Sequence, residues 1–190
     1  PIFRVEVVGR TAQAVNYRHR GGSTKINFQG TAIMPMAKGD AKVESERGVI
    51  HISADLKNMA APSSFGPEYL TYVLWAITPE GRATNLGELQ INGDDGRLEV
   101  TTELQSFALV VTAEPYFAVS QPSDVIVMEN VVRQDTVGKV DEIDAKFELL
   151  QRGQYSTLAG PRPVIEPKVP IELYEARSAL HIARATGAEK

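Results

Sequence analysis

The residue types that most often perform catalysis or bind metals are scattered along this 190-residue chain. Its histidines, His19, His51 and His181, show no metal-ligand spacing, whereas the ligands of a zinc ion have to converge. The absence of cysteine excludes disulfides, thiolate metal sites and thiol catalysis. We therefore expect exposed or structural histidines and predict no metal site.

Two acidic segments could be taken for a calcium loop or an acid–base pair. Segment 92–96, NGDDG, lacks the bidentate glutamate that ends a calcium loop, and its two glycines suit a tight turn. Segment 141–148, DEIDAKFE, alternates apolar and charged residues as an exposed strand does. A general acid needs a pocket that raises its pKa, and a solvated strand face does not supply one. We predict a turn and a strand in these segments.

Other catalytic signatures and the charge pattern also argue against an enzyme or a nucleic-acid-binding protein. The serines lie in no Gly-x-Ser-x-Gly motif, and the glycines form no phosphate-binding loop. The net charge is -4 and the 20 Lys and Arg residues are dispersed, so no basic surface is available for a nucleic-acid backbone. We predict a non-enzymatic protein without a cofactor or catalytic residues, and the pattern identifies no binding residue.

The elements that would position these residues are mostly β-strands. From residue 1 to about residue 152, short β-rich runs alternate with Gly, Pro, Asn and Asp, as in antiparallel sandwiches. The clearest alternation is in segment 49–56, whose even-numbered residues are apolar and should face the core. Glycines within segments 20–23 and 46–48 predict a hairpin turn at each place.

The most apolar strands predict the centre of the fold. Segment 72–77, YVLWAI, is apolar on both faces, and a turn at residues 79–81 separates it from a second strand. Segment 107–111 is apolar on both faces as well. Such strands are covered on both sides, and segment 72–77 is too short to cross a bilayer. We predict an antiparallel immunoglobulin-like or fibronectin-like sandwich in which Trp75 is buried.

Two loops combine aromatic residues with turn residues. Segment 60–68 contains Phe65, and segment 116–122 contains Phe117. Loops of this kind recognise partners in many proteins, but their rings can also cover the open end of a sandwich. We favour packing over recognition for both loops.

The composition changes after residue 152. Segment 153–170 contains four prolines, which fix φ and lack the amide donor, so it should be an extended connector. Segment 171–185 is rich in Ala, Leu, Glu and Arg and should be helical. The predicted organisation is a β-sandwich domain at 1–152, a proline-rich connector at 153–170 and a C-terminal helix at 171–190.

The predicted helix has one apolar stripe. Leu173, Ala176, Leu180 and Ala183 recur at helical spacing, and Gly187 is placed to end the helix. A helix of about 15 residues is marginal alone in water. It should therefore dock on the sandwich, pair with another copy, or form the first half of a helical hairpin.

Two segments of the sheet region resemble a known family. TYVLWAITPEGRATNLGEL (71–89) and SFALVVTAEPYFAVSQPSDVIVM (106–128) resemble the extracytoplasmic β-sandwich domain of bacterial anti-sigma-factor proteins. The matching positions are Tyr72, Trp75, Gly81, Leu86, Gly87, Glu114, Pro115 and Pro122. The chain departs from the family at Tyr116 and Phe117, where the family tends to have two glycines. The resemblance implies a fold and carries no catalytic motif.

The C-terminal segment ELYEARSALHIARATGAEK (172–190) resembles the first helix of a helical-hairpin module that precedes OmpA-like peptidoglycan-binding domains. The resemblance depends on Ala176, Ala179, Ala183 and the Gly187-Ala188 end. Together the two resemblances imply a sandwich in the periplasm, upstream of a helical spacer in an OmpA-like envelope protein.

The sequence leaves three functions open. The leading hypothesis is a non-enzymatic module of the cell envelope, a spacer or protein-interaction domain of an OmpA-like peptidoglycan-associated protein. The parent protein would be periplasmic or outer-membrane-associated, and this part soluble without a membrane-spanning segment. The alternatives are the extracytoplasmic sensor domain of an anti-sigma regulator and a carbohydrate-binding module. Because the chain begins at Pro1, we expect it to be a piece of a longer protein.

Overall fold

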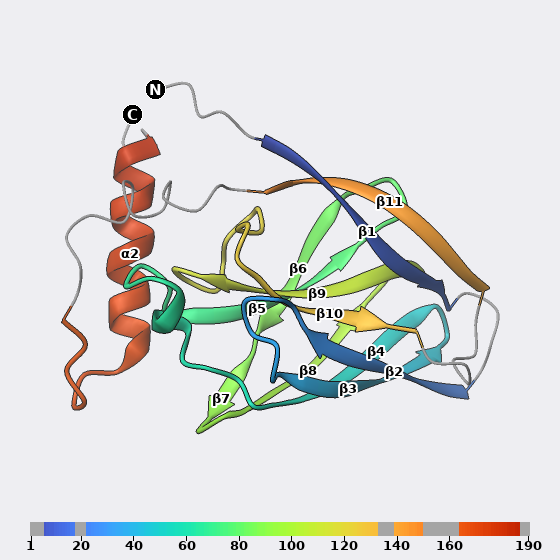
Figure 1. The fold of residues 1–190 in the computed structure, drawn as a ribbon, viewed down its shortest axis with the longest axis horizontal. Helices are drawn as coiled ribbons and strands as arrows, with labels where there is room; N and C mark the ends of the chain where they lie inside the picture. The colour runs from blue at the N-terminus through green and yellow to red at the C-terminus, as the bar shows by residue number, and fades with distance from the viewer. Residues whose placement is uncertain (1–5, 18–21, 133–138, 150–163, 187–190) are drawn as a thin grey trace.

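The protein is mostly antiparallel β-strand with one C-terminal α-helix (Figure 1). The computed structural model describes residues 6–17, 22–132, 139–149 and 164–186. The prediction of a β-rich protein with a C-terminal helix is confirmed at this level. The predicted connector lies largely outside the described residues.

The strands lie between residues 6 and 149. They are β1 (Glu6–Asn16), β2 (Gly22–Gly30), β3 (Lys38–Glu46), β4 (Val49–Lys57), β5 (Thr71–Ile77), β6 (Ala83–Glu88), β7 (Gln90–Asn92), β8 (Asp95–Thr102), β9 (Ser106–Glu114), β10 (Ile126–Val131) and β11 (Lys139–Leu149). A 3-10 helix, η1 (Pro62–Phe65), connects β4 to β5, and the α-helix is α2 (Ile171–Thr186).

All strands join one strongly curved, nearly closed sheet. Its order is β11-β1-β9-β10-β2-β3-β4-β8-β7, and β5 joins β9 to β6. Both β1 and β10 pair with the same edge of β9, at Phe107 and around Val111 respectively. Asn130 lies where they separate: its Oδ1 accepts from Leu109 N (2.8 Å) and its Nδ2 donates to Gln13 O (3.0 Å). This side chain replaces the backbone bonds that the separating strands do not make.

The predicted hairpin around segment 20–23 is wrong. In the described residues, β1 pairs with β11 and β9, whereas β2 pairs with β3 and β10. Alternation identifies the face of a strand that is buried, but it does not identify the neighbouring strand. The loop residues 18–21 lie outside the described residues.

The hairpin predicted at residues 46–48 is confirmed. β3 and β4 pair up to Glu46 and Val49, and the two residues between them, Arg47 and Gly48, have φ of 50° and 87°. Positive φ at both central residues is typical of the two-residue turns that match the twist of a hairpin. The even-numbered residues of β4 are buried, as the alternation predicts.

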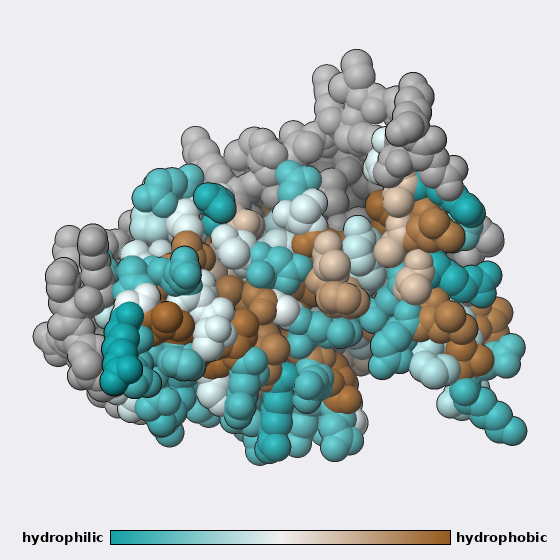
Figure 2. All heavy atoms as spheres, turned by 180° about the vertical axis from the view of Figure 1, so that it is seen from behind, coloured by the Kyte–Doolittle hydropathy of each residue, from teal (hydrophilic) through white to brown (hydrophobic). Residues whose placement is uncertain are grey.

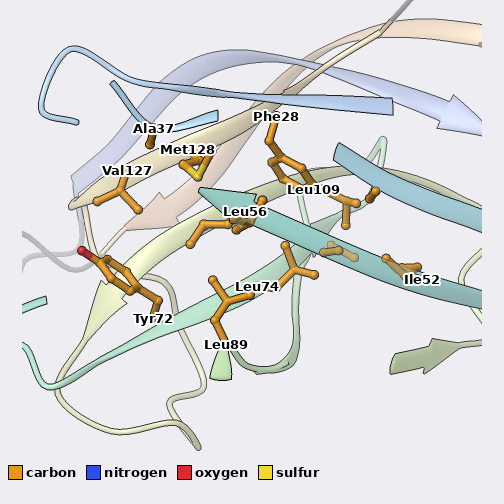
Figure 3. Close-up of a cluster of buried hydrophobic side chains, with 14 of the residues drawn as sticks. Phe28, Ala37, Ile52, Leu56, Tyr72, Leu74, Leu89, Leu109, Val127 and Met128 are labelled. Carbon is orange, nitrogen blue, oxygen red and sulfur yellow. The ribbon is translucent and has the colours of Figure 1, made fainter. Parts of the chain in front are cut away.

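The core lies on both faces of β5 and β9. All seven residues of β5 are buried, and Trp75 is 0% exposed, as predicted. On one face, Tyr72 and Leu74 pack with residues of β2, β3, β4 and β10 (Figure 3). On the other face, Trp75 packs with Ala14 of β1 and Leu149 of β11. Coverage on both sides explains the continuous apolar sequence of these strands.

The helix forms where the sequence predicts it, and the face by which it packs is not its apolar stripe. The buried residues of α2 are Tyr174, Glu175, Ser178 and Ile182, and Ile182 belongs to the main core. Leu173 and Leu180, which lie in the apolar stripe, are 56% and 48% exposed. The docking face is therefore less apolar than the exposed face. No helix in the described part of the chain is both long and apolar enough to cross a membrane.

Candidate functional site

A buried carboxylate lies at the end of β9. Glu114 is 0% exposed, and its Oε1 accepts hydrogen bonds from Thr112 Oγ1 (2.5 Å) and Ser123 N (2.7 Å). Thr112 Oγ1 also accepts from Trp75 Nε1 (2.8 Å). Trp75 and Glu114, two positions of the anti-sigma resemblance, are thus joined through one hydroxyl.

This network fixes the loop that follows β9. Ser123 Oγ donates to Ala113 O (2.7 Å) and accepts from Val125 N (3.2 Å), so the loop returns to the strand from which it leaves. A carboxylate with charge-assisted donors is a strong anchor. Since Glu114 is fully buried, it cannot reach a substrate in solution, and we assign the network a structural role.

The aromatic residues of the two predicted loops divide between packing and exposure. Phe65 packs on Tyr72, with ring centroids 6.5 Å apart in an edge-on arrangement. Tyr116 packs on both core clusters, and burial followed by the charge of Glu114 raises its pKa. Phe117 is exposed, so the prediction of packing is wrong for this residue.

The exposed part of the second loop is held by β6. Asn85 Nδ2 donates to Phe117 O (2.8 Å) and to Val119 O (2.9 Å). Val119 is buried in the cluster around Trp75. The loop therefore presents Phe117 on a backbone that is fixed on both sides of it.

The second buried carboxylate lies between α2 and the sheet. Glu175 is 2% exposed and belongs to the docking face of the helix. Its neighbour is Glu88, the last residue of β6, which accepts from Thr71 Oγ1 at 2.5 Å. Burial, and then the charge and hydrogen bonding of Glu88 and the charge of Glu172, raise the pKa of Glu175 to about 8. This carboxyl is therefore mostly protonated at pH 7.

Exposed apolar side chains gather at the C-terminal end of the described chain. More than half of the large hydrophobic residues that are exposed within the described residues belong to segment 164–180: Val164, Ile165, Ile171, Leu173 and Leu180. Tyr174 ties the start of this segment to the helix, because its hydroxyl accepts from Glu166 N (2.9 Å) and donates to Val164 O (3.1 Å). In the reverse view of Figure 2, brown side chains are visible on the side where α2 lies.

An open polar groove follows the outer face of β3, β4 and β8. Its volume is about 960 Å³, and it is lined by residues such as Lys42, Glu44, His51, Ser53 and Glu99. Lys42 and Glu44 form an ion pair at 2.7 Å within it. The groove is an ordinary solvated sheet face with paired charges, and it contains no aromatic residue.

The residues considered for metal binding or acid–base chemistry do not converge as far as their side chains are described. His51 is exposed on β4 and His181 lies on α2, while His19 is outside the described residues. Segment 92–96 contains the tight turn between β7 and β8, with Gly93 at φ 65°, as predicted. The backbone of segment 141–148 forms β11, but its side chains are outside the description. The described part of the chain contains no group of three or more His, Cys, Asp or Glu residues able to hold a metal.

Sequence reasoning missed the Glu88–Glu175 pair. Tyr174, Ser178 and Ile182 recur every four residues and mark the docking face, but the more apolar stripe on the opposite face hides this pattern. The signal in the sequence was a glutamate, Glu175, next to residues that recur every four positions.

Comparison of the chain with models of protein families, with curated proteins and with solved structures finds no match.

Proposed function

We propose that this chain is a non-enzymatic module of the bacterial cell envelope, a spacer or protein-interaction domain of an OmpA-like peptidoglycan-associated protein. The parent would be periplasmic or outer-membrane-associated. The observation that carries the proposal is the second apolar face of α2, which remains exposed although the helix is docked.

The occupant that best suits this face is a second amphipathic helix. Leu173 and Leu180 are seven residues apart and alternate along the stripe with Ala176 and Ala183. This is the repeat with which helices pack side by side, and the alanines allow a close approach. A helix that packs on the sheet with one face and on another helix with the opposite face is a rigid spacer. The resemblance of this segment to the first helix of a hairpin module supports the same arrangement.

The surroundings of the residues that could perform catalysis support a binding module over an enzyme. Glu114 is inaccessible, and Glu175 lies under a helix. The polar groove holds exposed and ion-paired side chains. We extend the proposal to the finer fold, an immunoglobulin-like or fibronectin-like sandwich, with support from the buried clusters on opposite faces of β5 and β9.

One observation favours the sensor domain of an anti-sigma regulator as a second candidate. Trp75 and Glu114, which carry that resemblance, meet in one hydrogen-bond network. By contrast, the carbohydrate-binding alternative needed Trp75 or several tyrosines on a flat exposed face. Trp75 is fully buried, so that alternative loses its main residue.

The coding sequence on both sides of this chain distinguishes the two candidates. An envelope parent should continue into a second amphipathic helix and a peptidoglycan-binding domain, and a signal peptide should precede the sheet. Fractionation of cells that express the tagged parent should then recover it with the envelope, and purified cell-wall sacculi should retain it. A membrane helix directly before the sheet, together with a cytoplasmic helical domain, would replace the proposal with the anti-sigma candidate.

A further inference from the structure

The junction between α2 and the sheet contains two carboxyl groups that face each other. We propose that Glu175, where it meets Glu88 of the sheet, makes the docking of α2 depend on a proton: the helix docks when Glu175 is protonated and is released when Glu175 ionises. The proposal concerns the helix and the sheet alone, and it holds whether or not the proposed envelope function is correct.

Glu88 is fixed on the sheet side of the junction. It ends β6 opposite Val73 of β5, and Thr71 Oγ1 donates to its Oε1 at 2.5 Å. Leu89 N donates to Tyr72 O (2.9 Å) immediately after it. The carboxyl of Glu88 is therefore held at the edge of the core, where the helix meets it.

Glu175 is fixed on the helix side, and none of the described residues donates a hydrogen bond to it. It is 2% exposed, and neither of its side-chain oxygens accepts a hydrogen bond from the described residues. An ionised carboxylate only accepts hydrogen bonds, so two ionised carboxylates cannot bond to each other. One proton supplies the missing donor and removes one negative charge at the same time.

The charges around Glu175 favour its protonated form. Among the described residues, the charged groups that act on Glu175 are Glu88 from β6 and Glu172 from α2 itself, and both are acidic. The contribution of β5, through Thr71, is a neutral hydroxyl. Loss of the proton from Glu175 would add a buried negative charge beside the half-buried carboxyl of Glu88.

Within the part of the chain that the structure describes, the helix has few other attachments that could resist this repulsion. Ile182 packs into the main core, and Tyr174 bonds to the segment just before the helix. The remaining members of its docking face are Glu175 itself and Ser178. A single helix of this length is marginal in water without its docking contacts, so undocking also exposes it to unfolding.

The pH window follows from the two states of Glu175. Its pKa is about 8 when the helix is docked and about 4.3 when it is exposed. The contribution of the proton to docking is therefore complete below about pH 4.3, decreases as the pH rises, and is lost by about pH 8. Acid favours the docked helix, and alkaline solution favours its release.

Hydrogen exchange of the backbone amides of α2 tests the proposal on the full chain. We compare the protection factors of residues 171–186 between pH 5 and pH 9, corrected for the intrinsic exchange rate. Wild-type protection should fall by at least about tenfold, since a shift of one pKa unit already changes an equilibrium by this factor. In Glu175→Gln, whose neutral amide can donate to Glu88, protection should stay constant with pH.

Two further variants separate the pair from general charge effects. Glu88→Gln supplies the donor from the other side and should also remove the pH dependence, whereas Glu99→Gln, the same charge change at an exposed position of β8, should keep it. Trp75 fluorescence reports independently that the sheet remains folded. Constant wild-type protection, or an equal fall in Glu175→Gln, would overturn the proposal.

Discussion

Glu114 and Glu175 are both buried glutamates, but their surroundings differ. Glu114 lies inside the sheet and accepts hydrogen bonds from Thr112 and Ser123. Glu175 lies between the helix and the sheet and faces other acidic groups. A buried carboxyl has to be compensated by donors or by a proton. The sheet supplies donors, whereas the helix junction depends on a proton from solution.

Glu114 is therefore an anchor that does not depend on the solution, whereas the contact at Glu175 depends on pH. Thr112 and Ser123 belong to β9 and its following loop, so the donors of Glu114 are fixed by the fold. The proton of Glu175 is exchanged with solvent and depends on the pH. The two regions should therefore respond differently to substitution and to acid, and the four predictions below test this from the largest effect to the smallest.

Replacement of Glu114 should give the largest loss of stability. Glu114→Ala removes the acceptor of two charge-assisted hydrogen bonds and leaves Thr112 and Ser123 N without it. The free energy of unfolding should fall by about 3 kcal/mol. Urea denaturation followed by Trp75 fluorescence measures this, and Glu99→Ala on the exposed face of β8 is the control, with a change within about 0.5 kcal/mol. Equal effects of the two variants would remove Glu114 as an anchor.

Removal of the Thr112 hydroxyl should cost less, because Ser123 N still donates to Glu114. Thr112→Val preserves shape but leaves Trp75 Nε1 without its acceptor. We expect a loss of about 2 kcal/mol in the same denaturation experiment. Thr101→Val, an exposed threonine on β8, is the matched control. If Thr112→Val left the free energy of unfolding unchanged, the network would not contribute to stability.

The effect on stability of replacing Glu175 by an apolar residue should depend on pH. At pH 8, Glu175→Leu removes a buried charge from an acidic site and should stabilise the protein by about 1 kcal/mol, within the range known for buried charges. At pH 5, protonation of Glu175 stabilises the wild type, so the stability advantage of Glu175→Leu should shrink or reverse. Urea denaturation at both pH values measures the difference. A constant advantage would contradict the role of the proton.

The smallest effect should come from Tyr174, a neutral polar group on the same helix face. Tyr174→Phe removes the hydroxyl that bonds to Val164 O and Glu166 N. We expect a loss of about 0.5 kcal/mol at both pH 5 and pH 8, because the substitution removes a hydrogen bond and leaves Glu88 and Glu175 in place. A pH-dependent effect of Tyr174→Phe would show that the pH dependence of the helix is not specific to Glu175.

The elements that could be predicted from the sequence are those whose signal lies within a few consecutive residues. The two-sided apolar runs of β5 and β9 indicate burial on both faces, and Trp75 is buried as predicted. The helix begins at Ile171, as its composition predicts. The turn at Arg47 and Gly48 could be predicted from the glycine, which adopts positive φ without steric cost.

The missed features depend on contacts between distant residues. β1 pairs with β11, which lies more than a hundred residues away, and no local signal specifies that neighbour. The docking face of α2 is set by Tyr174 and Ile182, although Leu173 and Leu180 form a more apolar stripe. The Glu88–Glu175 pair combines both problems, since its members come from β6 and α2 and neither is unusual in its own segment.

The most direct test of the contrast between the two glutamates is the titration of the Glu175 side chain by carbon-13 NMR, with the carboxyl resonance assigned through Glu175→Gln. Our account predicts a midpoint near pH 8 for this carboxyl, as burial beside Glu88 requires. A midpoint near 4.3, the ordinary value for a glutamate, would contradict the account, because it would mean that the helix docks without a proton at neutral pH.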